Sequence, residues 1–196
     1  MRSERRFSQA IAEGDGISLI VDVSDEDGAR RAAAQGAEAL VVRWQIGDLR
    51  AATELPILWR ASGSPSEAAL AGADAWLIVV DDAGDDGEWL ARQHAEGLEL
   101  GLDCVVGVRN EEELELALDR LDPEIFLLAA EDGEEHEGLQ SALELLPDIP
   151  AGKLAVVDFA VTNREQVEQL ERAGVDAVIV GATNVADLVG DGPPQV

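Results

Sequence analysis

Short apolar runs alternate with amphipathic segments along the chain. Runs rich in valine, isoleucine and leucine predict strands near residues 17–23, 39–44, 56–60, 75–80, 104–109, 125–130, 154–159 and 177–181. Polar segments with apolar residues at helical spacing predict helices near 26–35, 47–53, 64–71, 86–100, 111–121, 137–146 and 164–173. Continuous apolar strands between helices are typical of a parallel sheet that is buried on both faces.

One junction recurs between helix and strand: a glycine, a small or apolar residue, an acid and then an apolar run. It begins at Gly36, Gly72, Gly101 and Gly174. A glycine suits the left-handed position that follows a helix. Eight strands in strict alternation with helices predict a (βα)8 barrel, the TIM-barrel architecture, at minimal length. An open, doubly wound sheet is the alternative, and the absence of a linker predicts one domain over residues 1–196.

Composition restricts the partners of this chain. The 196 residues carry 41 acids against 14 basic residues, a formal charge of −27, which disfavours binding to nucleic acid or to an anionic membrane surface. Almost all the basic residues are arginines, and Lys153 is the one lysine. Acid excess with so little lysine predicts a halophilic, cytoplasmic protein, and an ordinary acidic protein is the alternative. We expect a monomer.

No metal or cofactor is predicted from the side chains. Cys104 is the only cysteine, so an internal disulfide and a multi-cysteine metal site are excluded. Neither His94 nor His136 has a second histidine nearby, and the acidic segments 81–86 and 131–137 are interpreted as solvated loops. The four tryptophans are expected to pack helices onto the barrel; they are Trp44, Trp59, Trp76 and Trp89.

Charged residues stand at several predicted strand ends, where the sites of such barrels lie. Arg43, Arg60 and Arg109 can bind a carboxylate or phosphate bidentately, so an anionic small molecule is one interpretation. The other is that these arginines only neutralise Asp22 and Asp158. If Asp22, Arg60, Arg109 and Asp158 share the inward register of their strands, we expect them to form ion pairs with one another, with Arg43 as a further member of the cluster.

The turn after the last strand, Gly181–Ala182–Thr183, offers backbone N–H groups and a hydroxyl. Phosphate commonly binds between the loops after strands seven and eight of such barrels. This turn is therefore a candidate phosphate site, and a simple strand-ending turn is the alternative.

Several segments resemble the indole-3-glycerol-phosphate synthase family of tryptophan biosynthesis. They are residues 7–23, 55–60, 71–78, 99–114 and 154–183. The resemblance implies a TIM barrel and a carbon–carbon lyase site at the carboxyl ends of its strands. Compared with that family, the lid helix at the amino end is expected to be absent and the last helix truncated.

The resemblance also identifies the catalytic positions. The family's strand-one glutamate aligns with Asp22, its strand-three lysine, the general acid, with Arg60, and its strand-seven glutamate with Asp158. Its strand-five glutamate aligns with Gly107. Arginine cannot release a proton near neutral pH, so weak or lost lyase activity is expected. The chain is then expected to bind a phosphorylated or carboxylated metabolite; the alternative is a structural or partner-binding barrel without a ligand.

Overall fold

Eight parallel strands form a closed barrel in chain order, from β1 to β8. A computed structural model describes residues 6–13, 16–80, 87–129, 140, 142–159, 161, 163–182 and 185–188. The (βα)8 prediction is confirmed, and the open-sheet alternative is wrong. The strands are β1 (Ser18–Asp22), β2 (Ala39–Val42), β3 (Ile57–Trp59), β4 (Ala75–Val79), β5 (Asp103–Val108), β6 (Ile125–Ala129), β7 (Leu154–Asp158) and β8 (Ala177–Gly181).

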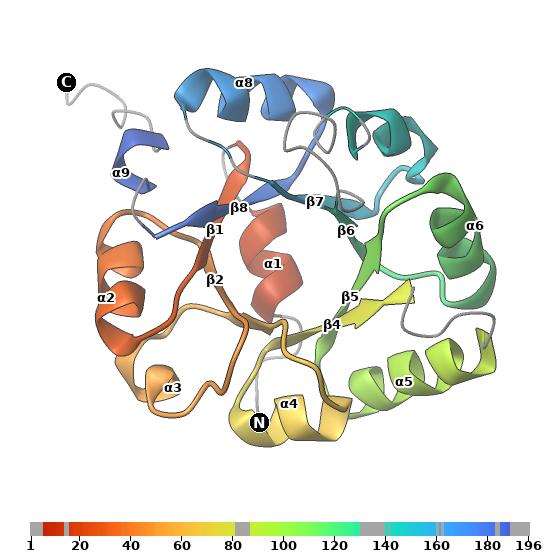
Figure 1. The fold of residues 1–196 in the computed structure, drawn as a ribbon, viewed down its shortest axis with the longest axis horizontal. Helices are drawn as coiled ribbons and strands as arrows, with labels where there is room; N and C mark the ends of the chain where they lie inside the picture. The colour runs from red at the N-terminus through yellow and green to blue at the C-terminus, as the bar shows by residue number, and fades with distance from the viewer. Residues whose placement is uncertain are drawn as a thin grey trace.

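Helices form a ring outside the barrel (Figure 1). Most begin at a side chain that accepts a backbone N–H of the first turn: Asn110 and Asn163 do so, and Ser64 forms a reciprocal capping box with Glu67. Gly72 and Gly174 end two helices at φ 90° and 95°. The helices are α2 (Glu26–Ala34), α3 (Leu49–Ala52), α4 (Pro65–Ala71), α5 (Gly87–Glu99), α6 (Glu111–Arg120), α8 (Arg164–Ala173) and α9 (Val185–Leu188).

Of the helix expected over 137–146, the structure describes residues 140 and 142–145 as helical, followed by a 3₁₀ turn, Leu146–Asp148. In the described segments, no helix has the length and apolar character that crossing a bilayer requires.

Side chains fill the inside of the barrel in layers. Alternation along the paired strands directs Ile20, Leu58, Val105 and Val156 of the odd-numbered strands into the same middle layer, and all four are fully buried. Because side chains two residues apart face the same way, the next inward layer toward the carboxyl ends contains Asp22, Arg60, Gly107 and Asp158. The apolar core therefore ends directly beneath three charged side chains.

The amino end of the barrel is closed by helix α1 (Arg6–Ala12), which lies across the barrel centre in Figure 1. Residues 7–23 were identified only by their family resemblance, and no helix was predicted there from the sequence. Phe7 and Ile11 are buried among the interior side chains. The carboxylate of Asp103 accepts the N–H groups of Phe7 and Ser8 at 3.0 and 2.9 Å and the Ser8 hydroxyl at 3.1 Å. Burial raises the pKa of Asp103 despite these bonds.

The acid of the recurring junction has a structural function. In three of the four copies its carboxylate accepts a backbone N–H from the beginning of the neighbouring strand, so it joins two strands at the amino end of the barrel. Asp103, in the fourth copy, binds α1 instead. The three bonds run from Leu19 N to Glu38 (3.2 Å), from Ile57 N to Asp74 (3.0 Å) and from Ala155 N to Asp176 (2.7 Å).

Candidate anion site at the barrel mouth

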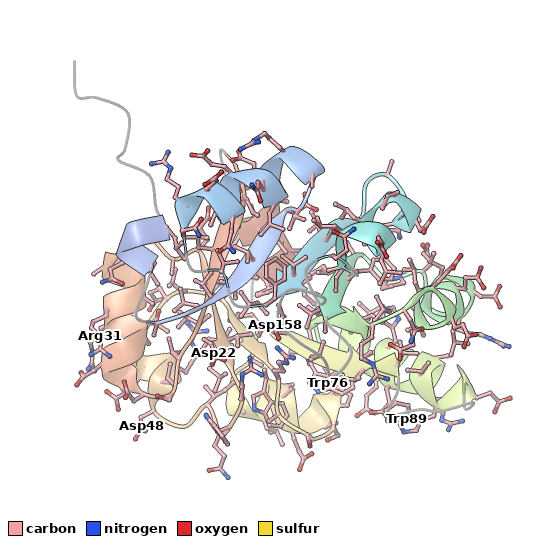
Figure 2. The ribbon with its side chains drawn as sticks, turned by 45° about the horizontal axis from the view of Figure 1, so that its top comes forward. Asp22, Arg31, Asp48, Trp76, Trp89 and Asp158 are labelled. Carbon is pink, nitrogen blue, oxygen red and sulfur yellow. The ribbon has the colours of Figure 1, made fainter. Side chains whose placement is uncertain are left out.

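Two aspartates and two arginines form a chain of ion pairs at the carboxyl end of the barrel. Arg43 Nε lies 2.5 Å from Asp22 Oδ2, and Arg43 Nη2 lies 3.8 Å from Asp158 Oδ2. Arg60 Nη1 donates to the same Asp158 oxygen. Figure 2 shows both aspartates near the centre of the barrel. The predicted pair of Arg60 with Asp158 is thus present, and Asp22 pairs with Arg43, which links the two acids.

The mouth cluster, which consists of Asp22, Arg43, Arg60 and Asp158, is electrically balanced and partly shielded from solvent. The side chains of Asp158 and Arg60 are 17% and 20% exposed, whereas those of Asp22 and Arg43 are 28% and 38% exposed. Asp158 is the least exposed member, and both arginines reach it. An ion pair at this depth interacts more strongly than one in free solvent.

The strand ends that carry the arginines are fixed by the neighbouring backbone. Arg60 N donates to Val42 O at 2.8 Å, which holds the end of β3 beside the end of β2. The indole N–H of Trp59 donates to the carbonyl of Trp44 at 2.5 Å. Trp59 is buried on the outer side of the barrel, as expected, but Trp44 is 66% exposed. The expectation that Trp44 packs a helix onto the barrel is therefore wrong.

Arg109 has a different partner from the one expected. Its guanidinium lies 2.7 Å from Glu113 Oε1, and its backbone N–H donates to Glu113 Oε2 at 2.8 Å. Arg109 is thus paired with the first turn of α6 instead of Asp22 or Asp158. The spacing of four residues between this arginine and an acid was the sequence signal for the pair, and the sequence analysis did not use it.

The candidate phosphate turn is described only in part. Gly181 is the register partner of Asp22 in the adjacent strand, so this turn begins beside the mouth cluster. Gly181 is exposed, and a Cβ at this position would meet no atom within 4 Å. Thr183 lies outside the described residues, as do the acidic segments 81–86 and 131–137. Phosphate binding at Gly181, Ala182 and Thr183 remains a prediction.

Other groups with potential chemistry lie away from the mouth. Lys153 precedes β7 at the amino end of the barrel, where its Nζ lies 2.6 Å from Asp122 Oδ1. Cys104 is buried, and burial raises the pKa of its thiol to about 12, so it stays protonated. Burial also lowers the pKa of His94, a residue of α5. Within the described segments, no group of three or more metal-ligating side chains is present.

Comparison with known proteins agrees with this geometry. The family model for indole-3-glycerol phosphate synthase matches residues 65–187, more than half of the chain. An indole-3-glycerol phosphate synthase from Geobacillus sp. (strain WCH70) is 28% identical over 144 residues, which are 71% of this chain and 55% of the relative. The chain therefore spans about half the length of this curated relative.

Two solved structures show the same fold at low identity. The tryptophan synthase A-subunit from Pyrococcus furiosus superposes with a TM-score of 0.61 at 19% identity and covers 87% of this chain and 88% of its own. A putative phosphonomutase from Burkholderia cenocepacia J2315 gives a TM-score of 0.65 at 15% identity and covers 91% and 93%. These likenesses support the barrel fold, whereas the family match rests on sequence: this chain belongs to the indole-3-glycerol phosphate synthase family.

Proposed function

We propose that this barrel binds a phosphorylated or carboxylated small metabolite at its mouth and has lost most or all of the lyase activity of its family. The observation that supports both parts is the inward layer of Asp22, Arg60, Gly107 and Asp158. It contains an arginine where the family resemblance requires a lysine, and a glycine where it requires a glutamate.

Anion binding is supported by the hydrogen-bonding capacity of the arginines. A guanidinium carries five N–H donors. Among the described residues, the Arg60 side chain donates one hydrogen bond, to Asp158, and Arg43 contacts Asp22 and Asp158 through Nε and Nη2. Both arginines thus keep N–H groups that can donate to a bound carboxylate or phosphate while other N–H groups of the same side chains pair with Asp158.

The phosphate group of such a ligand would bind at Gly181, Ala182 and Thr183. Gly181 lies directly beside Asp22 in the sheet. Its missing side chain leaves the backbone accessible to a bulky anion. A ligand carrying an anion at each end would therefore reach from this turn to Arg43 or Arg60.

Loss of the lyase reaction is supported by the chemistry of the mouth. Ring closure with loss of carbon dioxide and water needs a group that donates a proton near neutral pH. Arg60 occupies the position of the general acid, and a guanidinium group cannot serve as a proton donor near neutral pH. The one lysine in the chain, Lys153, lies at the opposite end of the barrel and cannot replace it. A role in tryptophan biosynthesis would then require a residual activity that depends on Asp22 and Asp158.

The experiment uses the family's substrate, 1-(2-carboxyphenylamino)-1-deoxyribulose 5-phosphate. We expect no increase in indole fluorescence when the chain is incubated with it at high salt, and a small increase for Arg60→Lys, which restores a titratable ammonium. Clear turnover by the unmodified chain would contradict the proposal. If neither the unmodified chain nor Arg60→Lys converts or binds this substrate, the mouth cluster has only a structural function and the alternative of a barrel without a ligand is correct.

A further inference from the structure

The ion pair between Arg60 and Asp158 crosses the mouth of the barrel. Strand β3, which leads to Arg60, and strand β7, which ends at Asp158, lie four strands apart in a closed barrel of eight, and so on opposite sides of it. Arg60 Nη1 donates to Asp158 Oδ2 across this opening. Two residues earlier in each chain segment, Leu58 and Val156 are fully buried, so the pair lies directly on the apolar core. It therefore occupies the centre of the face at which such barrels bind ligands.

Asp158 limits how strongly the two arginines attract a further anion. Arg43 Nη2 lies 3.8 Å from the same carboxylate oxygen, so both guanidinium groups face one acid. Together with Asp22, which lies 2.5 Å from Arg43 Nε, the mouth cluster holds two positive and two negative charges. An anion that bound the remaining N–H groups of Arg60 would lie beside the Asp158 carboxylate, and like charges at that separation repel each other.

The surroundings do not relieve this repulsion. The side chains of Arg60 and Asp158 are mostly shielded from solvent, so water and salt screen their charges less than they would at the surface. The formal charge of −27 on the whole chain adds no attraction for an anion. A ligand with a single anionic group would thus gain little at Arg60. A ligand with a second anionic group would also be held by the turn that begins at Gly181, next to Asp22 in the sheet.

We propose that Asp158 is a specificity-determining residue: its carboxylate competes with bound anions for Arg60, so that the mouth retains only ligands with two anionic groups. This inference rests on the proposed function, which places an anion at Arg60 or Arg43 and a phosphate at the Gly181 turn. An Asp158 that only held Arg60 in place would strengthen anion binding, whereas a competitor weakens it. The two roles predict opposite results when the negative charge of Asp158 is removed.

The test uses two probes that share an aromatic carboxylate. N-methylanthranilate carries this group alone, and 1-(2-carboxyphenylamino)-1-deoxyribulose 5-phosphate carries a phosphate as well. Calorimetric titration at one moderate salt concentration measures the affinity of the complete chain for each. We expect the unmodified chain to bind the phosphate ester more tightly than N-methylanthranilate. Asp158→Asn, which removes the charge but keeps a hydrogen-bond acceptor, is expected to bind both probes at least about tenfold more tightly than the unmodified chain does.

Two further variants separate competition from other effects. Asp158→Glu keeps the carboxylate and is expected to bind both probes as weakly as the unmodified chain does. Asp119→Asn changes the net charge by the same amount at an 81% exposed position on α6 and is expected to leave both affinities unchanged. An equal gain in affinity for Asp119→Asn, or for Asp158→Glu, would overturn the proposal.

The outcomes distinguish this inference from the proposed function. Tighter binding by Asp158→Asn supports the competition, and it does so even if the unmodified chain binds neither probe, a result that would contradict the proposed function alone. Binding of the ester by the unmodified chain, with equal or weaker binding by Asp158→Asn, would overturn the competition and leave the proposed function intact.

A second measurement does not depend on the folding of a variant. When the ester binds the unmodified chain, the NMR signal of the Asp158 carboxyl carbon is expected to shift, because two carboxylates then share Arg60. An unchanged signal in the bound state would overturn the proposal.

Discussion

Asp158 is the residue on which the mouth cluster depends, because Arg43 and Arg60 both reach its carboxylate. Among the described residues, Asp22 pairs with Arg43 alone. Removing Asp158 therefore leaves Arg60 without an opposite charge among the described residues, whereas removing Asp22 leaves each arginine beside an acid. Removing Asp158 should therefore lower the free energy of unfolding more than removing Asp22, because a partly buried charge left without its partner is destabilising.

Asp158→Ala is accordingly expected to lower the free energy of unfolding by about 2–3 kcal/mol, most of it from the uncompensated charge on Arg60. Urea unfolding at moderate salt measures this change. The control is Asp119→Ala, whose carboxylate is 81% exposed and lies 3.7 Å from Arg120. Its cost should stay within about 0.5 kcal/mol. An equal loss in the free energy of unfolding for the two variants would show that the ion pairs at the mouth stabilise the chain no more than an exposed ion pair does.

The buried carboxylate of Asp103 should make the stability of the chain depend on pH. Burial raises its pKa above the ordinary value of 3.8, so the folded chain binds this proton more tightly than the unfolded chain does. The contribution of Asp103 to the free energy of unfolding therefore falls as pH rises from about 3.8 through the higher native value.

The measurement compares the unmodified chain with Asp103→Asn by urea unfolding across this pH range. The stability of the unmodified chain relative to the variant is expected to decrease with rising pH and then level off. Asp119→Asn, at an exposed position, should show no such trend. A relative stability that increases with pH would mean that the three hydrogen bonds to Asp103 outweigh its burial.

At the scale of elements, the repeated junction joins neighbouring strands through its acid as well as turning the chain through its glycine. The pattern of glycine and acid was visible in the sequence and correctly indicated repeating βα units. The partner of the acid was not visible, because the N–H that it binds belongs to a strand that precedes it by about 20 residues, as Asp176 and Ala155 show. Helix α1 was missed for a similar reason, because Asp103 holds it from 95 residues away.

Asp176→Ala tests the junction. Its carboxylate accepts the Ala155 N–H at 2.7 Å, and burial raises its pKa. Leaving that N–H unpaired is expected to cost about 1–3 kcal/mol in the free energy of unfolding. Glu165→Ala, an exposed acid on α8, serves as the control and should change stability by less than about 0.5 kcal/mol. A cost for Asp176→Ala as small as that of the control would remove the structural function assigned to the acid.

For the molecule as a whole, strand alternation predicted the barrel and placed Asp22, Arg60 and Asp158 in one layer. It could not choose a partner for Arg109, because a long side chain at a strand end reaches either the mouth or the next helix, and Glu113 lies only four residues away. It also could not foresee that Trp44 would be exposed. The barrel could be predicted from the periodicity of apolar residues. The partners of the long side chains at the strand ends could not, because they depend on how far each side chain extends.

The net charge of −27 should make the melting temperature of the chain depend on salt. If the surface is adapted to salt, screening its self-repulsion should raise the melting temperature as KCl increases from about 0.1 M to 2 M. Guanidinium chloride up to about 0.2 M should also stabilise the chain, because at that concentration screening outweighs its denaturing effect. A melting temperature unaffected by KCl and lowered by dilute guanidinium would identify an ordinary acidic protein.

Binding of an anionic metabolite by the mouth cluster can be measured by calorimetric titration with 1-(2-carboxyphenylamino)-1-deoxyribulose 5-phosphate. We expect saturable binding by the unmodified chain and binding weakened at least about tenfold in Arg60→Gln. Binding should be unchanged in Arg30→Gln, because the ion pairs lost there, with Glu26 and Asp27, lie on the outer surface of α2. Absence of binding by the unmodified chain, or equal binding by all three chains, would contradict anion binding by the mouth cluster.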